Sequence, residues 1–137
     1  MAGYAAPVLQ RDHSPLTASL LIGIAWTVRH VSLIAAMPSL RFDVPLRAYL
    51  GPYAAWLTAQ SVFHTWMHNA SGGGVPVAVL AHSTVNATFL VAIREGLPEV
   101  LEPEHASRAM RAITGAWAVV ALAIAGGTRG RLASVGE

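Results

Sequence analysis

Residues 16–37 read LTASLLIGIAWTVRHVSLIAAM, and this stretch decides the fold class. As a helix it would be about 33 Å long, at a rise of ~1.5 Å per residue. Because the hydrocarbon core of a bilayer is roughly 30 Å thick, the stretch is long enough to cross it. Among its side chains only Arg29 and His30 are ionisable. We therefore predict a membrane-spanning helix over residues 16–37.

Three further apolar stretches have comparable length, namely Ala48–Met67, Val75–Ile93 and Met110–Gly127. The segments between them are typical of turns and water-facing loops, since residues 38–47 and 94–104 are rich in Pro and charge and residues 69–74 read NASGGG. The sequence thus predicts an all-α, polytopic transmembrane helical bundle with about four spanning helices. Residues 1–128 would form a single membrane-embedded domain and residues 129–137 a short tail.

The composition excludes several classes of protein. Hydrophobic residues make up 54% of the chain and charged residues 12%, whereas a soluble domain carries about 25% charged residues. A net charge of only +2 provides no basic patch, so we expect no nucleic-acid partner. The chain contains no Cys, which excludes disulfides and thiolate metal sites. We expect an integral membrane protein in contact with membrane lipid.

Polar side chains inside the predicted spans mark the candidate site, because each is costly in the apolar layer. His82 and Asn86 are spaced i, i+4, which places both on one helix face. A neutral imidazole can take a proton from water or ligate a metal, and a carboxamide can orient water or donate to an oxyanion. The structural alternative is that the two side chains hydrogen-bond each other or bridge neighbouring helices.

Other polar residues lie in the first two spans. We expect His30 to face His82 across the bundle, and Arg29 to avoid lipid in a crowded bundle or beside a water-filled cavity. His64 and His68 form a second i, i+4 pair. That spacing occurs in zinc-binding HExxH helices, but the intervening Glu is missing here, so packed or solvated histidines are the alternative.

Two of these segments resemble motifs of the CPBP intramembrane proteases, the group that contains CAAX prenyl proteases and bacteriocin-processing or self-immunity proteins. Trp26-Thr-Val-Arg-His30 resembles their aromatic-x-x-x-His motif. His82-Ser-Thr-Val-Asn86 resembles their His-x-x-x-Asn motif. The similarity covers roughly the first two thirds of the chain, up to about residue 89.

The resemblance implies an intramembrane endopeptidase that hydrolyses a peptide bond of a peptide or protein substrate near the membrane interface, in a bacterial-type plasma membrane. It implies that His30, His82 and Asn86 are catalytic residues. His30 and His82 would hold water or a metal, either zinc or another divalent ion. Asn86 would orient the water or stabilise the oxyanion.

The family's Glu-Glu-x-x-x-Arg motif, which is implied to activate water, is missing, and no Glu precedes Glu95. We expect that an upstream segment carries it and that this chain is part of a protease, because the motif would end just before Gly3. The alternative is a non-catalytic membrane protein derived from that family, with an immunity or partner-binding role. A metal transporter is a third hypothesis, which the lack of carboxylates and internal repeats supports poorly.

Overall fold

The computed structural model describes residues 2–37, 44–95 and 102–133, with side chains described except at residues 2–3 and 88–95. Every regular element in these ranges is a helix: α1 (Ala2–Leu9), α2 (Pro15–Ala36), α3 (Leu46–Ala70), α4 (Val75–Glu95) and α5 (Pro103–Gly127). The four longer helices coincide with the four predicted apolar stretches, and α5 begins earlier than predicted. The short α1 was not predicted. The all-α fold class is thus confirmed for the described residues.

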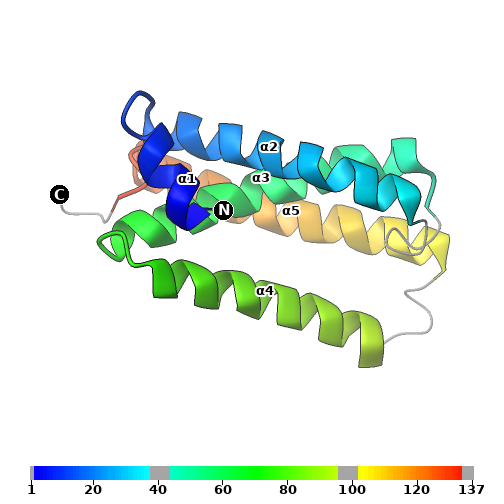
Figure 1. Cartoon of the computed structure of the whole chain (residues 1–137). Helices are drawn as coiled ribbons and strands as arrows, with labels where there is room; N and C mark the ends of the chain where they lie inside the picture. Colours follow the sequence, from blue (N-terminus) through cyan, green and yellow to red (C-terminus); the bar gives the residue numbers. More distant parts are fainter. Residues whose placement is uncertain (1, 38–43, 96–101, 134–137) are drawn as a thin grey trace.

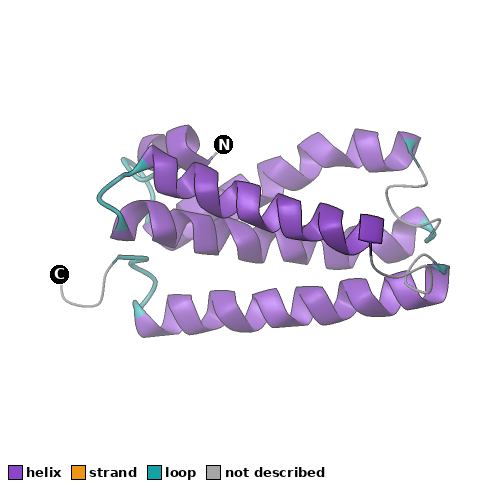
Figure 2. Ribbon diagram, turned by 90° about the horizontal axis from the view of Figure 1, so that it is seen from below, coloured by secondary structure: helices purple, strands orange, loops and turns teal. Residues whose placement is uncertain are grey.

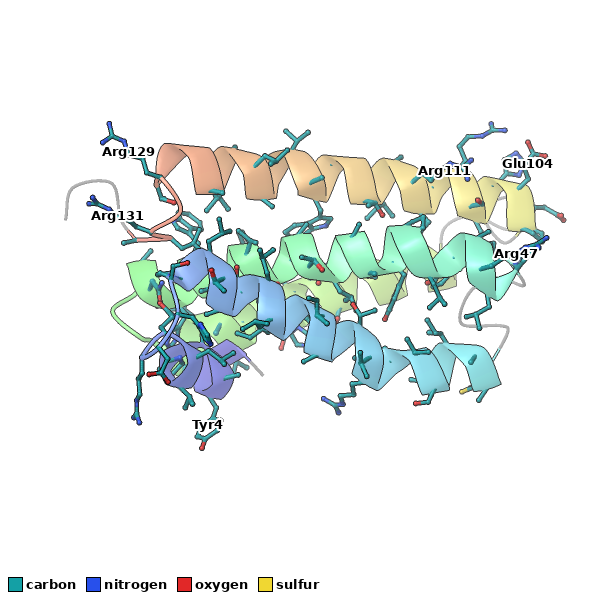
Figure 3. The ribbon with its side chains drawn as sticks, turned by 90° about the horizontal axis from the view of Figure 1, so that it is seen from above. Tyr4, Arg47, Glu104, Arg111, Arg129 and Arg131 are labelled. Carbon is teal, nitrogen blue, oxygen red and sulfur yellow. The ribbon has the colours of Figure 1, made fainter. Side chains whose placement is uncertain are left out.

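Consecutive long helices run in opposite directions, so the bundle has two ends (Figure 1, Figure 2). The start of α2, the end of α3, the start of α4 and the end of α5 lie at one end. Figure 3 labels Arg129 and Arg131 at this end, and Arg47, Glu104 and Arg111 at the other. This alternation is the geometry that a chain crossing a bilayer repeatedly requires.

The start of α2 is fixed by local chemistry. Ser14 has an extended backbone, and its hydroxyl accepts a hydrogen bond from the Thr17 amide at 3.2 Å. Such a cap satisfies one of the amides that lack partners in the first helical turn. Pro15 follows at the first helical position, where its missing N–H costs nothing. The helix therefore begins one residue before the predicted Leu16.

Helix α3 lies at the centre of the bundle and packs extensively on both α2 and α5. The largest cluster of buried apolar residues joins these three helices and includes Ile34, Tyr53, Trp56, Leu57 and Met110. Toward the other end of α3, Phe63 meets Trp117 of α5 edge-on, with ring centroids 5.4 Å apart. The Thr114 hydroxyl also lies 3.0 Å from the Pro52 carbonyl oxygen, linking α5 to α3.

Helices α2 and α3 approach each other at Gly23. A Cβ atom at this position would lie 2.7 Å from Thr58 Cα and 2.8 Å from Ser61 Oγ. The Ser61 hydroxyl lies 2.6 Å from the Ser19 carbonyl oxygen and is completely buried there. Small residues of this kind let two helix backbones approach closely, as in membrane helix pairs.

In the described part of the chain, helix α4 packs more lightly than the other long helices. It contacts α3 and α1, and its His82 meets Trp26 of α2. The turn that precedes it contains Gly72 and Gly73, whose φ angles of +66° and +87° suit glycine. Helix α1 and the turn after it close this end of the bundle. Gln10 and Asn69 exchange two side-chain hydrogen bonds there, at 3.0 and 3.2 Å.

Residues 129–133, in the predicted tail, fold back against the bundle. Leu132 is completely buried, and its amide donates to the Thr128 hydroxyl at 3.2 Å. Gly130 lies close to the Leu16 side chain, since a Cβ atom added to it would be 3.6 Å from Leu16 Cδ2. The described part of the tail therefore covers the start of α2.

Two of the four predicted spans are supported by length and composition, namely Pro15–Ala36 and Pro103–Gly127. Helix α3 does not meet the same criterion. The side chains of α4 are described only for Val75–Ala87, which is apolar but shorter than a span. The prediction of about four spans is thus shown only in part. Helix α3 is less apolar than a typical span because it lies at the centre of the bundle. Polar residues such as Gln60 and Thr65 are buried there among neighbouring helices.

Replacing Gly23 by Ala should lower the free energy of unfolding by about 1–3 kcal/mol, the usual cost of overpacking a tight contact. The added methyl group would meet the backbone of α3, which cannot rotate away. Gly115→Ala is the matched control, because no atom lies within 4 Å of its added Cβ. Unfolding of both variants in mixed detergent micelles checks this, and equal stability of the two would contradict the close α2–α3 contact.

If α3 and α4 also cross the membrane, single cysteines introduced at Asp12, Ser71 and Arg129 should react with a membrane-impermeant thiol reagent on one side. Cysteines at Arg47 and Glu104 should react on the other side. The chain has no cysteine of its own, so the background is zero. Labelling of Ser71→Cys on the Glu104 side would show that only α2 and α5 cross.

Candidate functional site

Three helices contribute the polar and aromatic residues of the candidate site. Helix α2 provides Trp26, Arg29 and His30, whose i, i+3, i+4 spacing places them on one face. Helix α3 provides His64, and α4 provides His82. The rings gather around Trp26, whose centroid lies 5.3 Å from that of His82 and 6.2 Å from those of His30 and His64.

His82 and Asn86 contact each other directly, as their spacing predicted. The Asn86 amide nitrogen lies 3.1 Å from His82 Nε2. Because an amide N–H can only donate, Nε2 of His82 is the acceptor and its proton sits on Nδ1. The second N–H of the Asn86 amide has no partner among the described residues. The Asn86 amide therefore satisfies Nε2 of His82 with one of its N–H groups, and its other N–H remains available to donate.

His30 and His64 are each oriented by a carbonyl group of their own helix. His30 Nδ1 lies 2.8 Å from the Trp26 oxygen, and His64 Nδ1 lies 2.7 Å from the Gln60 oxygen. A carbonyl oxygen can only accept, so both imidazoles are protonated on Nδ1. In both rings Nε2 thus carries a lone pair directed away from the backbone. This is the form of neutral histidine that can act as a base or bind a metal.

Two cavities are lined by α2 and α3 together with α4, and both include Trp26 and His82 in their lining; Tyr4 of α1 also lines one of them. The smaller has a volume of about 330 Å³, and all three predicted catalytic residues, His30, His82 and Asn86, line it. The larger has a volume of about 500 Å³ and is lined by His64 and His82. Trp26 and Arg29 line both. Arg29 thus lies beside both cavities, and its side chain is exposed.

The structure separates the second predicted histidine pair. His64 joins the candidate site, with its ring centroid 5.6 Å from that of His82. His68 lies one turn further along α3, lines neither cavity, and is close to Gly73 of the turn. Spacing along the sequence paired His64 with His68 because it relates residues of one helix only. The contact of His64 with His82 arises from the packing of α3 against α4.

The aromatic lining of the smaller cavity was not predicted from the sequence. The Tyr53 ring lies 6.4 Å from that of His30 and stacks on Tyr49 at 5.3 Å. Gln60, which orients His64, is also part of this lining. The only signal in the sequence was helical periodicity, since residues 49, 53, 56, 57 and 60 recur at intervals of three and four.

A metal fits this residue set only partly. His30 offers a bare Nε2, but Nε2 of His82 already accepts from Asn86. Within residues 2–37, 44–87 and 102–133, no three His, Cys, Asp or Glu residues are grouped to hold a metal ion. A closed zinc site uses four protein ligands, and an open one three. Metal binding by His30 and His82 stays a prediction.

All three site imidazoles should carry their proton on Nδ1 at neutral pH, the tautomer that carbonyl and amide contacts impose. We expect ¹⁵N NMR of histidine-labelled protein to show a non-protonated Nε2 for His30, His64 and His82. The exposed His13 and His105 are internal controls without such contacts and should show the ordinary mixture. A protonated Nε2 in neutral His82 would contradict the hydrogen bond from Asn86.

Comparisons with known proteins identify no relative of this chain. No protein-family model, no curated protein and no solved structure matches it. The resemblance to the CPBP proteases therefore depends on the motif residues of α2 and α4. What the structure adds is that these residues line one cavity.

Proposed function

We propose that this chain is a membrane-embedded endopeptidase of the CPBP type that hydrolyses peptide bonds near the membrane interface. The observation that supports this proposal is the common lining of one cavity by His30, His82 and Asn86, which come from two helices. His30 lies six residues before the end of α2, hence about 9 Å from that end at ~1.5 Å per residue. That depth lies in the outer third of a hydrocarbon core roughly 30 Å thick.

His30 is the proposed base. Its Nε2 would take a proton from a water molecule while the water oxygen attacks the carbonyl carbon of the peptide bond. The Trp26 carbonyl, 2.8 Å from Nδ1, holds the ring in the tautomer that leaves Nε2 free. The same nitrogen would then return the proton to the departing amine as the C–N bond breaks. Base catalysis of this kind contributes about 10²–10⁴-fold to a rate.

Asn86 is the proposed donor to the oxyanion that forms when the carbonyl group is attacked. One N–H of its amide points to His82 Nε2 at 3.1 Å, which leaves the other to donate to the new negative charge. His82 thus positions the carboxamide and does not need to exchange a proton itself. A single donor in this role accounts for about 10²–10³-fold in rate.

A second candidate function is that of a non-catalytic membrane protein that binds a partner. It is favoured by one specific observation, namely that no Asp or Glu is among the described residues that line either cavity. His82 and Asn86 would then serve to hold α4 in shape through their hydrogen bond. The two candidates differ in what is lost when a site residue is removed.

The test uses the chain reconstituted in liposomes with a mixture of single-span peptides, and mass spectrometry to detect new peptide termini. Replacing His30 by Ala should lower cleavage by about 10²–10⁴-fold. Asn86→Ala should lower it by about 10²–10³-fold. His105→Ala, at an exposed position on α5, is the control and should cleave normally.

Thermal unfolding of the same variants separates the two functions. For a protease, His30→Ala and Asn86→Ala should retain the wild-type unfolding temperature within a few degrees while losing cleavage. If the wild-type protein produces no new termini, and Asn86→Ala instead loses about 0.6–2 kcal/mol of stability, the partner-binding function is supported. Cleavage that is unaffected by either substitution would show that the activity lies elsewhere.

A further inference from the structure

The larger cavity continues the candidate site toward the middle of α2. It has a volume of about 500 Å³, and Trp26 and His82 belong to its lining as well as to that of the smaller cavity. Ile22, which lines only the larger cavity, lies eight residues before His30 on α2. At ~1.5 Å per residue, the cavity therefore reaches about 12 Å along the helix from the proposed base.

The apolar part of the wall comes mainly from α4. Val75, Ala78 and Val79 have i, i+3, i+4 spacing, so they lie on one face of the helix. Helix α2 adds Ile22 and the Trp26 ring. The remaining lining residues outside this wall and outside the three polar ones discussed next have exposed side chains, namely Tyr4, Arg29 and Ser83.

The three other polar residues of the lining offer little to a polar ligand. The Ser61 hydroxyl lies 2.6 Å from the Ser19 carbonyl oxygen. Nε2 of His64 is buried with almost no accessible surface. Nε2 of His82 already accepts from the Asn86 amide at 3.1 Å. The wall of the cavity therefore favours an apolar group.

The contact of Trp26 with His82 limits the conformation of a bound peptide. Their ring centroids lie 5.3 Å apart, so α2 and α4 approach each other closely at this level. A helical peptide is about 10–12 Å wide and would not fit between them. An extended peptide advances by ~3.3 Å per residue, so three or four of its residues cover the distance from His30 to the level of Ile22.

We propose that the larger cavity binds a large apolar side chain of the peptide substrate, such as Leu or Phe, three or four residues from the cleaved bond and on the side of the bilayer centre. This inference rests on the proposed protease function and adds a sequence requirement to it. The side chain would lie against Val79, Ala78 and Ile22. A substrate with Ala at this position would bury less apolar surface and bind less well.

Cleavage of designed peptides tests the position of this side chain. A series of single-span peptides shares one sequence, except that a single Leu or Phe replaces Ala at successive positions. In liposomes containing the full chain, we expect Leu or Phe to raise kcat/KM at least about tenfold over Ala when it lies three or four residues from the cleaved bond, on the side of the bilayer centre. Mass spectrometry locates the cleaved bond. A preference confined to the residues next to that bond, or none at any position, would overturn the proposal.

Variants of α4 assign the preference to the cavity. Val79→Phe would fill part of it and should abolish the preference for Leu over Ala, while peptides with Ala are cleaved as by the wild type. Leu80→Phe is the matched control, because Leu80 is 67% exposed and lines neither cavity. Thermal unfolding checks that both variants fold, and Val75→Phe is used if Val79→Phe does not. An unchanged preference in the filled variant, or an equal loss in Leu80→Phe, would contradict the assignment.

Photocrosslinking tests the same contact without peptide cleavage. The probe is a single-span peptide with photo-leucine in the middle of its span, added to the His30→Ala variant in liposomes. We expect an adduct on residues 75–79, for which an unlabelled peptide with Leu competes at least about tenfold better than one with Ala. A photoactivatable phosphatidylcholine tests the alternative occupant, an acyl chain. Labelling of residues 75–79 by the lipid and not by the peptide, or equal competition by the two peptides, would refute the proposal.

The two assays separate this inference from the proposed function. An adduct on residues 75–79 without any cleavage by the wild type would refute the protease function and leave the apolar side-chain site in place. Cleavage without this adduct, and without any dependence on Leu, would support the protease function and refute the site.

Discussion

The contact of α2 with α3 at Gly23 determines how every other part of this structure is placed. A glycine facing the Thr58 backbone brings the two helix axes together, and the buried Ser61 hydroxyl, 2.6 Å from the Ser19 oxygen, holds them there. One turn further along α2, this approach brings Trp26 within 6.2 Å of His64. Because α3 also carries α5 on its opposite side, a looser crossing would disturb the aromatic core and both cavities together.

The candidate site uses backbone carbonyls where the sites of many enzymes use carboxylates. Two histidines donate Nδ1–H to carbonyl oxygens four residues earlier in the same helix, and the third accepts from a carboxamide. A carbonyl fixes the tautomer of an imidazole as a carboxylate does, but it brings no net negative charge into an apolar layer. This arrangement suits an apolar layer, where a buried carboxylate needs a compensating cation.

The helices could be predicted well from the sequence, and the site only in part. Apolar length predicts four of the five helices, and i, i+4 spacing predicts the His82–Asn86 contact, because both are properties of a single segment. The short α1 has no such signal. The pairing of His64 with His82 depends on the helix crossing, which one sequence does not reveal. Polar side chains also lower the mean hydropathy of α3, because a central helix contacts other helices on most sides and can bury polar groups against them.

The unequal packing of α4 has a mechanical consequence. Helices α2 and α3 touch backbone to backbone, so neither can tilt without breaking the contact at Gly23, and α5 is fixed to α3 by interleaved aromatic rings. Within the described residues, helix α4 has no comparable contact, and it follows a turn with two glycines of positive φ. A shift of α4 would change the volume of both cavities without breaking the close contact of α2 and α3 at Gly23. The volume of the cavities thus depends most directly on the position of α4, which is the most lightly packed of the long helices in the described part of the chain.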